Sequence, residues 1–340
     1  MKSKLSAGEF FKKFGIVIVL VALFIVFALL NPLFMDPGNI MELLKQVAFM
    51  GIIAVGMTFC MLTGGIDLSV GSNMALAIVV AALVMAQVPF NTQEANAILG
   101  SLVGIGAATA IGFANGFFVN EIKIPPLIVT LAMMQIVRGL VYIFTGAVPV
   151  YENIPEVFSF VGQGSVGPVP FPVIVMGAVF VIGGIILHKT VYGRHVYCVG
   201  GNEEVARLSG IHVKKVKYSV YMISGLLTGV AGILLFSRMN SGQPRAGLGY
   251  EFEVVTACVL GGISMAGGSG KLWGVFFGVV IMGVLSYGLV SVGLNEFWQM
   301  FIKGVVLLVA VGIDSMSQAK QQNLVELRRE EEERKKEAAA

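Results

Sequence analysis

Ionisable side chains inside long apolar runs are the residues of this sequence that could do chemistry. Asp67 follows the run that ends at Leu62, and Arg138 lies within another apolar run. A charge in a bilayer costs on the order of 3 kcal/mol on insertion scales, so such residues usually line a cavity or pair with each other. Asp67 is therefore either a pathway residue or the N-cap of the helix that runs through Ser69. Arg138 needs a partner, and Asp67 is one candidate.

Few other groups could contribute to chemistry. The remaining candidates near the ends of apolar runs are Glu251, Glu253, Lys303 and Asp314. The sequence has no Ser/His/Asp or Cys/His arrangement, no paired catalytic carboxylates and no metal-ligand spacing, and its three Cys residues form no recognisable disulfide framework. Residues 267–271 are followed by Leu272, where a phosphate-binding loop needs Ser or Thr. These observations favour transport over catalysis and predict no metal and no cofactor.

Two glycine-rich segments interrupt apolar runs and resemble each other. Residues 63–72 have the sequence TGGIDLSVGS, and residues 260–270 have the sequence LGGISMAGGSG. Glycine interruptions at corresponding places in two halves are typical of a transport pathway, whereas close helix packing through glycine is the alternative. The match indicates an internal duplication. The candidate pathway residues are Gly64, Gly65, Asp67, Ser69, Arg138, Gly261, Gly262 and Ser264.

A polar, basic island at residues 188–217 separates two apolar regions. Its six Lys and Arg residues exclude it from hydrocarbon and predict the cytoplasmic side. Asn202 is typical of a helix N-cap, and Gly210 is typical of the residue that ends a helix. The pattern predicts a short docking helix with one apolar stripe, and a solvated loop with one surface helix is the alternative. The residues of the predicted docking helix are Gly201, Asn202, Glu203, Glu204, Val205, Arg207, Leu208, Gly210 and Ile211.

Composition places most of the chain in a membrane. Of its 340 residues, 56% are hydrophobic and 13% are charged, against about 25% charged in typical soluble domains. We expect an all-α polytopic membrane protein with about ten transmembrane helices. The predicted spans are 14–33, 46–62, 70–87, 97–119, 127–145, 170–187, 218–237, 252–266, 272–291 and 297–314.

Charge fixes the predicted topology. The outer loops 88–96 and 146–169 contain no Lys or Arg, so the positive-inside rule puts both termini in the cytoplasm. The predicted organisation is a cytoplasmic N-terminus at 1–13, a transmembrane region at 14–314 that contains the island, and a charged cytoplasmic tail at 315–340 that forms a solvated helix. The basic residues flank spans and form no stripe with aromatic residues, which excludes nucleic acid as a partner.

Several segments together resemble one known family. The most specific of them are residues 63–72, 123–131, 135–140, 200–204, 237–244 and 260–270. Through these segments, the chain from about Val17 to Asp314 is similar to the membrane permeases of bacterial ATP-binding-cassette (ABC) importers for simple sugars, of the ribose, arabinose and galactose type. Val205 departs from the Ala expected in that family, and it enlarges the apolar face of the predicted docking helix.

The resemblance implies a permease homodimer in the cell (inner or plasma) membrane, surrounded by lipid, that translocates a monosaccharide. It implies that residues 201–211 are the coupling helix for a cytoplasmic ABC ATPase, of the tandem-cassette type, and that an extracytoplasmic binding protein delivers the sugar. ATP hydrolysis then belongs to the ATPase, and this chain is not an enzyme. An ABC permease for a non-sugar such as autoinducer-2 or a nucleoside is one alternative, and an ion-coupled secondary carrier is another.

Overall fold

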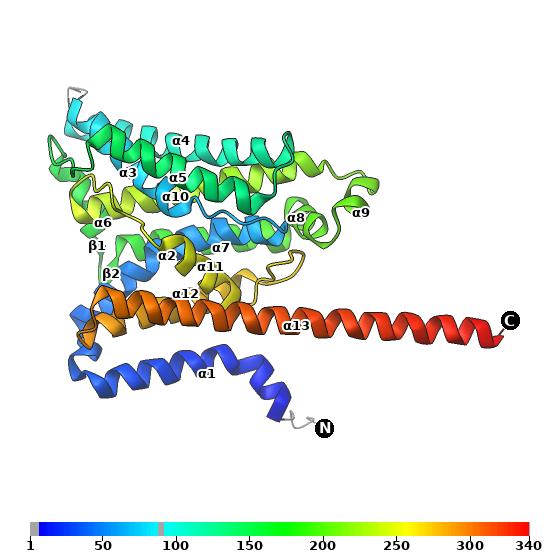
Figure 1. Ribbon diagram of the computed structural model, residues 1–340. Coiled ribbons are helices and arrows are strands. Elements are labelled where there is room, and N and C mark those ends of the chain that lie inside the picture. Colours follow the sequence, from blue (N-terminus) through cyan, green and yellow to red (C-terminus); the bar gives the residue numbers. More distant parts are fainter. Residues whose placement is uncertain (1–6, 88–91, 340) are drawn as a thin grey trace.

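The computed structural model describes residues 7–87 and 92–339, which form a bundle of helices (Figure 1). Residues 1–6 of the predicted N-terminus and residues 88–91 of the predicted outer loop lie outside the described residues. The long helices are α1 (Ala7–Leu30), α2 (Pro37–Leu62), α3 (Val70–Gln87), α4 (Gln93–Asn120), α5 (Pro126–Thr145), α7 (Phe171–Lys189), α10 (Val213–Met239), α12 (Leu272–Ser291) and α13 (Glu296–Ala339). The short elements are η1 (Pro32–Met35), η2 (Glu156–Phe158), α6 (Ser159–Gln163), an antiparallel pair of strands β1 (Ser165–Val166) and β2 (Val169–Pro170), α8 (Val191–Gly201), α9 (Glu203–Leu208) and α11 (Tyr250–Leu260).

Eight of the described helices are long and apolar enough to cross a membrane, which confirms the all-α polytopic architecture. They are α2, α3, α4, α5, α7, α10, α12 and the part of α13 up to Met316. The first predicted span corresponds to a shorter apolar stretch of α1, Gly15–Leu30. The count of ten spans stays a prediction.

The predicted span at 252–266 is not one long helix. At this place α11 has 11 residues, or about 16 Å of helix, which is roughly half of a 30 Å hydrocarbon layer. The helix ends because Gly262 adopts a left-handed conformation with φ of +82°. Hydropathy alone does not distinguish such a half-helix from a span.

The segments that the predicted topology puts on one side of the membrane lie at one end of the bundle (Figure 1). α13 extends as one continuous helix beyond the bundle, at the end where α1 begins and where α8 and α9 lie (Figure 1). The boundary predicted at Asp314 between span and tail is therefore not a break in the helix. That this end faces the cytoplasm stays a prediction from the distribution of Lys and Arg.

Helix α10 is the centre of the fold, where it packs against α2, α3 and α4. Glycines on both sides bring α4 and α10 into close contact. A Cβ on Gly112 of α4 would overlap the backbone carbonyl of Tyr221, and a Cβ on Gly225 of α10 would lie 2.5 Å from the carbonyl oxygen of Ala108. The glycines therefore allow backbone-to-backbone packing of the kind that small residues provide in membranes.

We expect Gly112→Ala to destabilise the protein by about 1–3 kcal/mol, because the added methyl group has to push the α4 and α10 backbones apart. Thermal unfolding in detergent would show a lower Tm. Gly106→Ala is the matched control, since Gly106 is on the same helix and a Cβ there would meet nothing within 4 Å. Equal Tm values for the two variants would contradict this account of the contact between α4 and α10.

Candidate functional site

The two glycine segments meet in space. Leu62, at the end of α2, accepts a hydrogen bond through its carbonyl oxygen from the backbone N–H of Gly268 at 2.9 Å. A Cβ on Gly267 would lie 2.6 Å from the backbone nitrogen of Gly64. Each segment follows the C-terminal end of a helix, α2 or α11, and these helices pack together, with Thr58 and Cys258 in side-chain contact. Parallel repeats would have this arrangement.

This junction rests on the end of α8. Gly200 leaves no room for a side chain, because a Cβ there would overlap the carbonyl oxygen of Leu62 and lie 2.6 Å from the backbone nitrogen of Gly268. The Tyr197 hydroxyl donates a hydrogen bond to the carbonyl of Gly270 at 2.9 Å. Burial raises the pKa of Tyr197, so this hydroxyl stays a donor at neutral pH. The predicted docking helix α9 begins three residues after Gly200 and is thus joined directly to the junction.

Helix α9 has the predicted caps. The side-chain oxygen of Asn202 accepts a hydrogen bond from the backbone N–H of Val205 at 3.0 Å, and Gly210 has φ of +83° just after the helix. The side chains of Val205 and Leu208 are 57% and 78% exposed, whereas Ile211 is half-buried. The caps are thus confirmed. Of Val205, Leu208 and Ile211, the three apolar residues of the predicted stripe, Val205 and Leu208 form an apolar surface that the described residues leave exposed.

Ion pairs surround this apolar surface. Arg207 pairs with Glu204 at 2.6 Å within α9, and Glu203 pairs with Lys217 of α10 at 2.5 Å. Exposed pairs of this kind contribute little stability, so their main effect here is on orientation and local charge. A groove of about 670 Å³ runs beside them, between the end of α9 and the start of α10, and its lining includes Ile211.

Asp67 is fully buried and has a complete set of hydrogen-bond donors. Its Oδ1 accepts from the backbone N–H of Ser69 at 3.1 Å, from the Ser69 hydroxyl at 2.5 Å and from the Asn115 amide at 3.3 Å. Its Oδ2 accepts from the Ser224 hydroxyl at 2.7 Å. Asp67 is therefore not a helix N-cap in the strict sense. It closes the turn before α3 and ties that turn to α4 and α10.

Arg138 lies elsewhere, and it has different partners from the one considered above. Its Nη1 donates to the backbone carbonyls of Pro244 at 2.8 Å and Ala246 at 3.0 Å. Within the described part of the chain, Arg138 and Asp67 share neither a hydrogen bond nor an ion pair. Arg138 thus holds the segment that leads into α11.

The remaining predicted pathway residues lie at the junction. Gly261 and Gly262 form the turn after α11, and a Cβ on Gly65 would lie 2.6 Å from the Tyr221 hydroxyl. The Ser264 hydroxyl accepts from the amide of Gln318 on α13 at 3.1 Å. These contacts place Gly65 against α10 and the turn after α11 against α13.

A pocket of about 540 Å³ lies between α11 and α13, and of its lining residues the sequence analysis identified only Glu253 and Lys303. Glu253 and Lys303 pair there at 2.7 Å. Gln299 donates to the carbonyl of Leu294 at 2.8 Å, and Thr256 donates to a carbonyl of its own helix. The polar groups of this pocket are therefore largely satisfied by each other and by the backbone.

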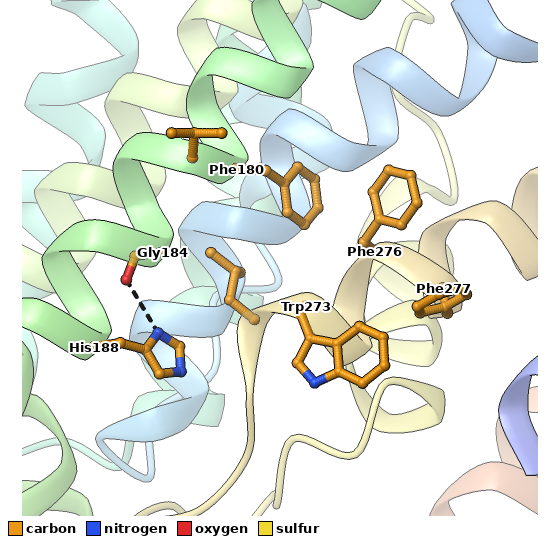
Figure 2. A pocket seen from close by; sticks show the side chains of 8 residues that line it. Phe180, Gly184, His188, Trp273, Phe276 and Phe277 are labelled. Atoms are coloured by element: carbon orange, nitrogen blue, oxygen red, sulfur yellow. Dashed lines mark hydrogen bonds between the residues drawn. The ribbon is translucent and has the colours of Figure 1, made fainter. Parts of the chain in front are cut away.

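An aromatic groove of about 570 Å³ separates α7 from α12 (Figure 2). The rings of Phe180 and Phe276 meet edge to face across it, at 5.6 Å between centroids. Its polar side-chain atoms are the indole nitrogen of Trp273 and the ring nitrogens of His188, whose Nδ1 lies 3.1 Å from the carbonyl oxygen of Gly184. Such apolar walls suit hydrocarbon rather than a hydroxyl-rich solute.

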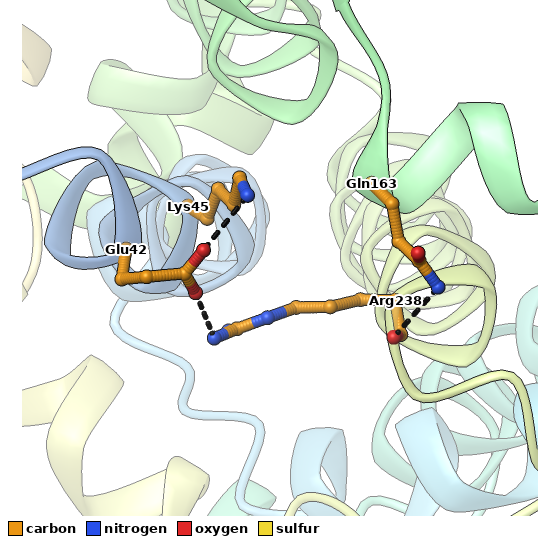
Figure 3. Close-up of polar contacts among 4 residues, drawn as sticks. All are labelled: Glu42, Lys45, Gln163 and Arg238. Carbon is orange, nitrogen blue, oxygen red and sulfur yellow. Dashed lines mark hydrogen bonds and ion pairs between the residues drawn. The ribbon is translucent and has the colours of Figure 1, made fainter. Parts of the chain in front are cut away.

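At the end of the bundle that lies opposite α8 and α9, the Glu42 carboxylate joins α2 to α10 (Figure 3). Glu42 pairs with Lys45 at 2.8 Å and with Arg238 at 2.7 Å. The Gln163 amide donates to the carbonyls of Ser237 and Arg238, both at 3.2 Å. The Glu42–Arg238 ion pair, called the Glu42–Arg238 clamp below, joins the ends of α2 and α10. The Gln163 amide fixes the loop that contains α6 onto the same end of α10.

Throughout the described residues, no group of three or more His, Cys, Asp or Glu side chains could hold a metal ion.

Comparisons with known proteins agree with this architecture. Residues 39–311 match the family described as branched-chain amino acid transport system / permease component. The chain is 41% identical over 309 residues to ribose import permease protein RbsC of Bacillus subtilis (strain 168), covering 91% of this chain and 94% of that protein. It is 40% identical over 304 residues to RbsC of Escherichia coli (strain K12), covering 88% and 93%. It is 38% identical over 317 residues to L-arabinose transport system permease protein AraH of the same strain, covering 93% and 94%. No solved structure matches the chain significantly.

We expect Asp67→Ala to lower stability by about 3 kcal/mol or more, because the hydroxyls and amide that surround Asp67 lose their acceptor in the core. Asp67→Asn should cost less, since the amide keeps one oxygen and the Ser224 hydroxyl can turn to accept a hydrogen bond. Chemical or thermal unfolding in detergent measures both. Equal losses in the two variants, or none, would show that the hydrogen bonds to Asp67 do not hold the fold together.

Proposed function

This chain belongs to the branched-chain amino acid transport system / permease component family, and we propose that it is the permease subunit of an ABC importer that moves a monosaccharide into the cytoplasm. The chain is a multi-pass protein of the inner (plasma) membrane. The family description names amino acids, so the sugar class rests on relatives that are 38–41% identical over most of their length and are named for ribose import and L-arabinose transport.

An ATPase partner is supported by the exposed apolar surface of α9. Leu208 is 78% exposed on a capped helix in a basic region, where lipid would not cover it. A helix that presents Val205 and Leu208 between charged residues has the form of an element that docks into an apolar groove. Residues 201–211 are accordingly the coupling helix of the proposal, and the partner is an ABC ATPase, of the tandem-cassette type.

The connection from α9 to the junction supports a mechanical role. When the ATPase closes on ATP, α9 moves with it, and the contact of Gly200 with Leu62 and Gly268 transmits that movement to the ends of α2 and α11. The helices beside the glycine segments then open the path alternately to the two sides. The permease provides the path, and the ATPase supplies the free energy.

Two further partners belong to the proposal. An extracytoplasmic binding protein delivers the sugar at the end of the bundle that carries the Glu42–Arg238 clamp. A second copy of this chain completes the permease as a homodimer. Residues 315–339 continue α13, and the predicted cytoplasmic tail at 315–340 is assigned no transport role.

The alternative functions differ from the proposal in the substrate or in the energy source of transport. An ABC permease for a non-sugar such as autoinducer-2 or a nucleoside would keep the same α9 and junction. An ion-coupled carrier would need titratable groups free to exchange protons or cations at depth. Lys303 pairs with Glu253, and Asp67 has donors at both oxygens, so of these buried carboxylates only Glu251 keeps an oxygen without a hydrogen bond in the described structure. A single group of this kind is less than the relay that an ion-coupled carrier needs, which favours the externally driven permease.

We expect proteoliposomes that contain only this chain to show neither ATP hydrolysis nor sugar accumulation. Adding the ATPase and the binding protein encoded beside it should produce ATP-dependent uptake, tested with ribose, arabinose and galactose. The affinity of that binding protein for each sugar identifies the substrate. Accumulation by the permease alone under a proton or sodium gradient would instead support a secondary carrier.

We expect Leu208→Asp to weaken ATPase docking at least tenfold, because a carboxylate would enter an apolar groove. The fold should tolerate the change, since this side chain is mostly exposed. Co-purification with the ATPase and uptake in reconstituted vesicles measure the effect. Leu208→Met, which keeps an apolar side chain of similar volume, is the control and should behave as wild type. Wild-type docking by Leu208→Asp would reduce α9 to a solvated surface helix.

A further inference from the structure

An exposed amide lies at the centre of a membrane span. Gln135 is at the middle of α5, and within the central turns of the eight described spans it is the only exposed polar side chain. Its side chain makes no hydrogen bond within the described residues. A glutamine amide facing lipid tails would leave its donors and acceptor unsatisfied, which hydrocarbon penalises strongly. Gln135 therefore faces something polar.

Other polar groups gather at the same depth. Arg138, one helical turn further along α5, is only 8% exposed and bonds to the carbonyls of Pro244 and Ala246. Arg138 also interacts electrostatically with Glu251, in the first turn of α11. One carboxylate oxygen of Glu251 is buried without a hydrogen-bond partner in the described structure.

Two helices begin beside this carboxylate. α3 starts at Val70 and α11 at Tyr250, and the Glu251 side chain lies against Gly71, where a Cβ would overlap it. Both helices are preceded by non-helical backbone inside the membrane region. Interrupted helices whose N-terminal ends lie at depth form the substrate sites of many transporters. Some polar groups here thus have no hydrogen-bond partner in the described structure. In the pocket between α11 and α13, by contrast, Glu253 and Lys303 pair with each other.

The chemistry of this set suits a neutral solute with many hydroxyl groups. The side chains of Arg138 and Glu251 have opposite formal charges, so together they add no net formal charge that would attract an ion. The Gln135 amide both donates and accepts, as neighbouring hydroxyl groups require. We infer that Gln135 lines the translocation path and hydrogen-bonds to the sugar at the middle of the membrane, beside Arg138 and Glu251. This inference rests on the proposed sugar-import function and names a contact residue for it.

Thiol accessibility tests the inference directly. The background is Cys198→Ser, because Cys198 is exposed whereas Cys60 and Cys258 are buried. Gln135→Cys is compared with Ile136→Cys, the next residue of α5, which is 55% exposed and points about 100° further around the helix. A membrane-impermeant methanethiosulfonate reagent reacts with thiolates in water and not with thiols in lipid. In vesicles that contain the permease, the ATPase and the binding protein, we expect Gln135→Cys to react at least tenfold faster than Ile136→Cys.

Uptake by the same vesicles provides the second readout. Gln135→Leu should lower the maximal rate of sugar uptake at least tenfold with unchanged membrane insertion, and Gln135→Asn should retain more activity. Equal, slow labelling at both positions would place Gln135 in lipid and overturn the inference. So would rapid disulfide formation between two copies of Gln135→Cys on mild oxidation, since the residue would then lie in a contact between copies, and so would wild-type uptake by Gln135→Leu. If the wild-type permease shows no ATP-dependent uptake in these vesicles, the proposed function fails, whatever the labelling result.

Discussion

The backbone contact between Leu62, Gly200 and Gly268 is the interaction on which the functional arrangement of this chain depends. One carbonyl oxygen, that of Leu62, accepts the Gly268 N–H at 2.9 Å and faces Gly200 so closely that no side chain fits there. Through it, the ends of α2, α8 and the turn after α11 form one unit. Because the contact is between backbones, it has no flexible side chain that could absorb movement. A displacement of α9 therefore reaches two interrupted helices at once.

The polar groups inside the membrane region have two different roles. Asp67, with its donors on three separate segments, fixes the turn before α3 against α4 and α10, and Arg138 fixes the approach to α11 through backbone carbonyls. These satisfied networks form the frame. Glu251 and Gln135 retain free hydrogen-bonding capacity at the same depth. A solute can only compete for groups of this second kind, because satisfied ones would have to lose a bond to bind it.

The two ends of the bundle are built differently, in keeping with different partners. At the end with α6, the Glu42 carboxylate and the Gln163 amide hold loop and helix ends together, so the surface there is fixed by polar contacts within the chain. At the other end, α9 presents Val205 and Leu208 without a partner from the described chain. A surface fixed in this way suits reversible docking of the proposed binding protein, and a free apolar helix suits lasting association with the proposed ATPase.

The sequence by itself determined the membrane class, most of the helices and the caps of α9, because these depend on neighbouring residues. Asn202 and Gly210 act within a few residues of themselves, and apolar runs of about 20 residues form spans wherever they pack. Only the tertiary structure decided what the charged residues at depth contact. Asp67 meets Asn115 and Ser224 across 48 and 157 residues of chain, and Arg138 bonds to carbonyls that every residue carries, so no sequence pattern identifies these partners. The sequence also did not reveal that α11 is a half-helix. A short helix that is buried inside the protein needs residues as apolar as those of a full span.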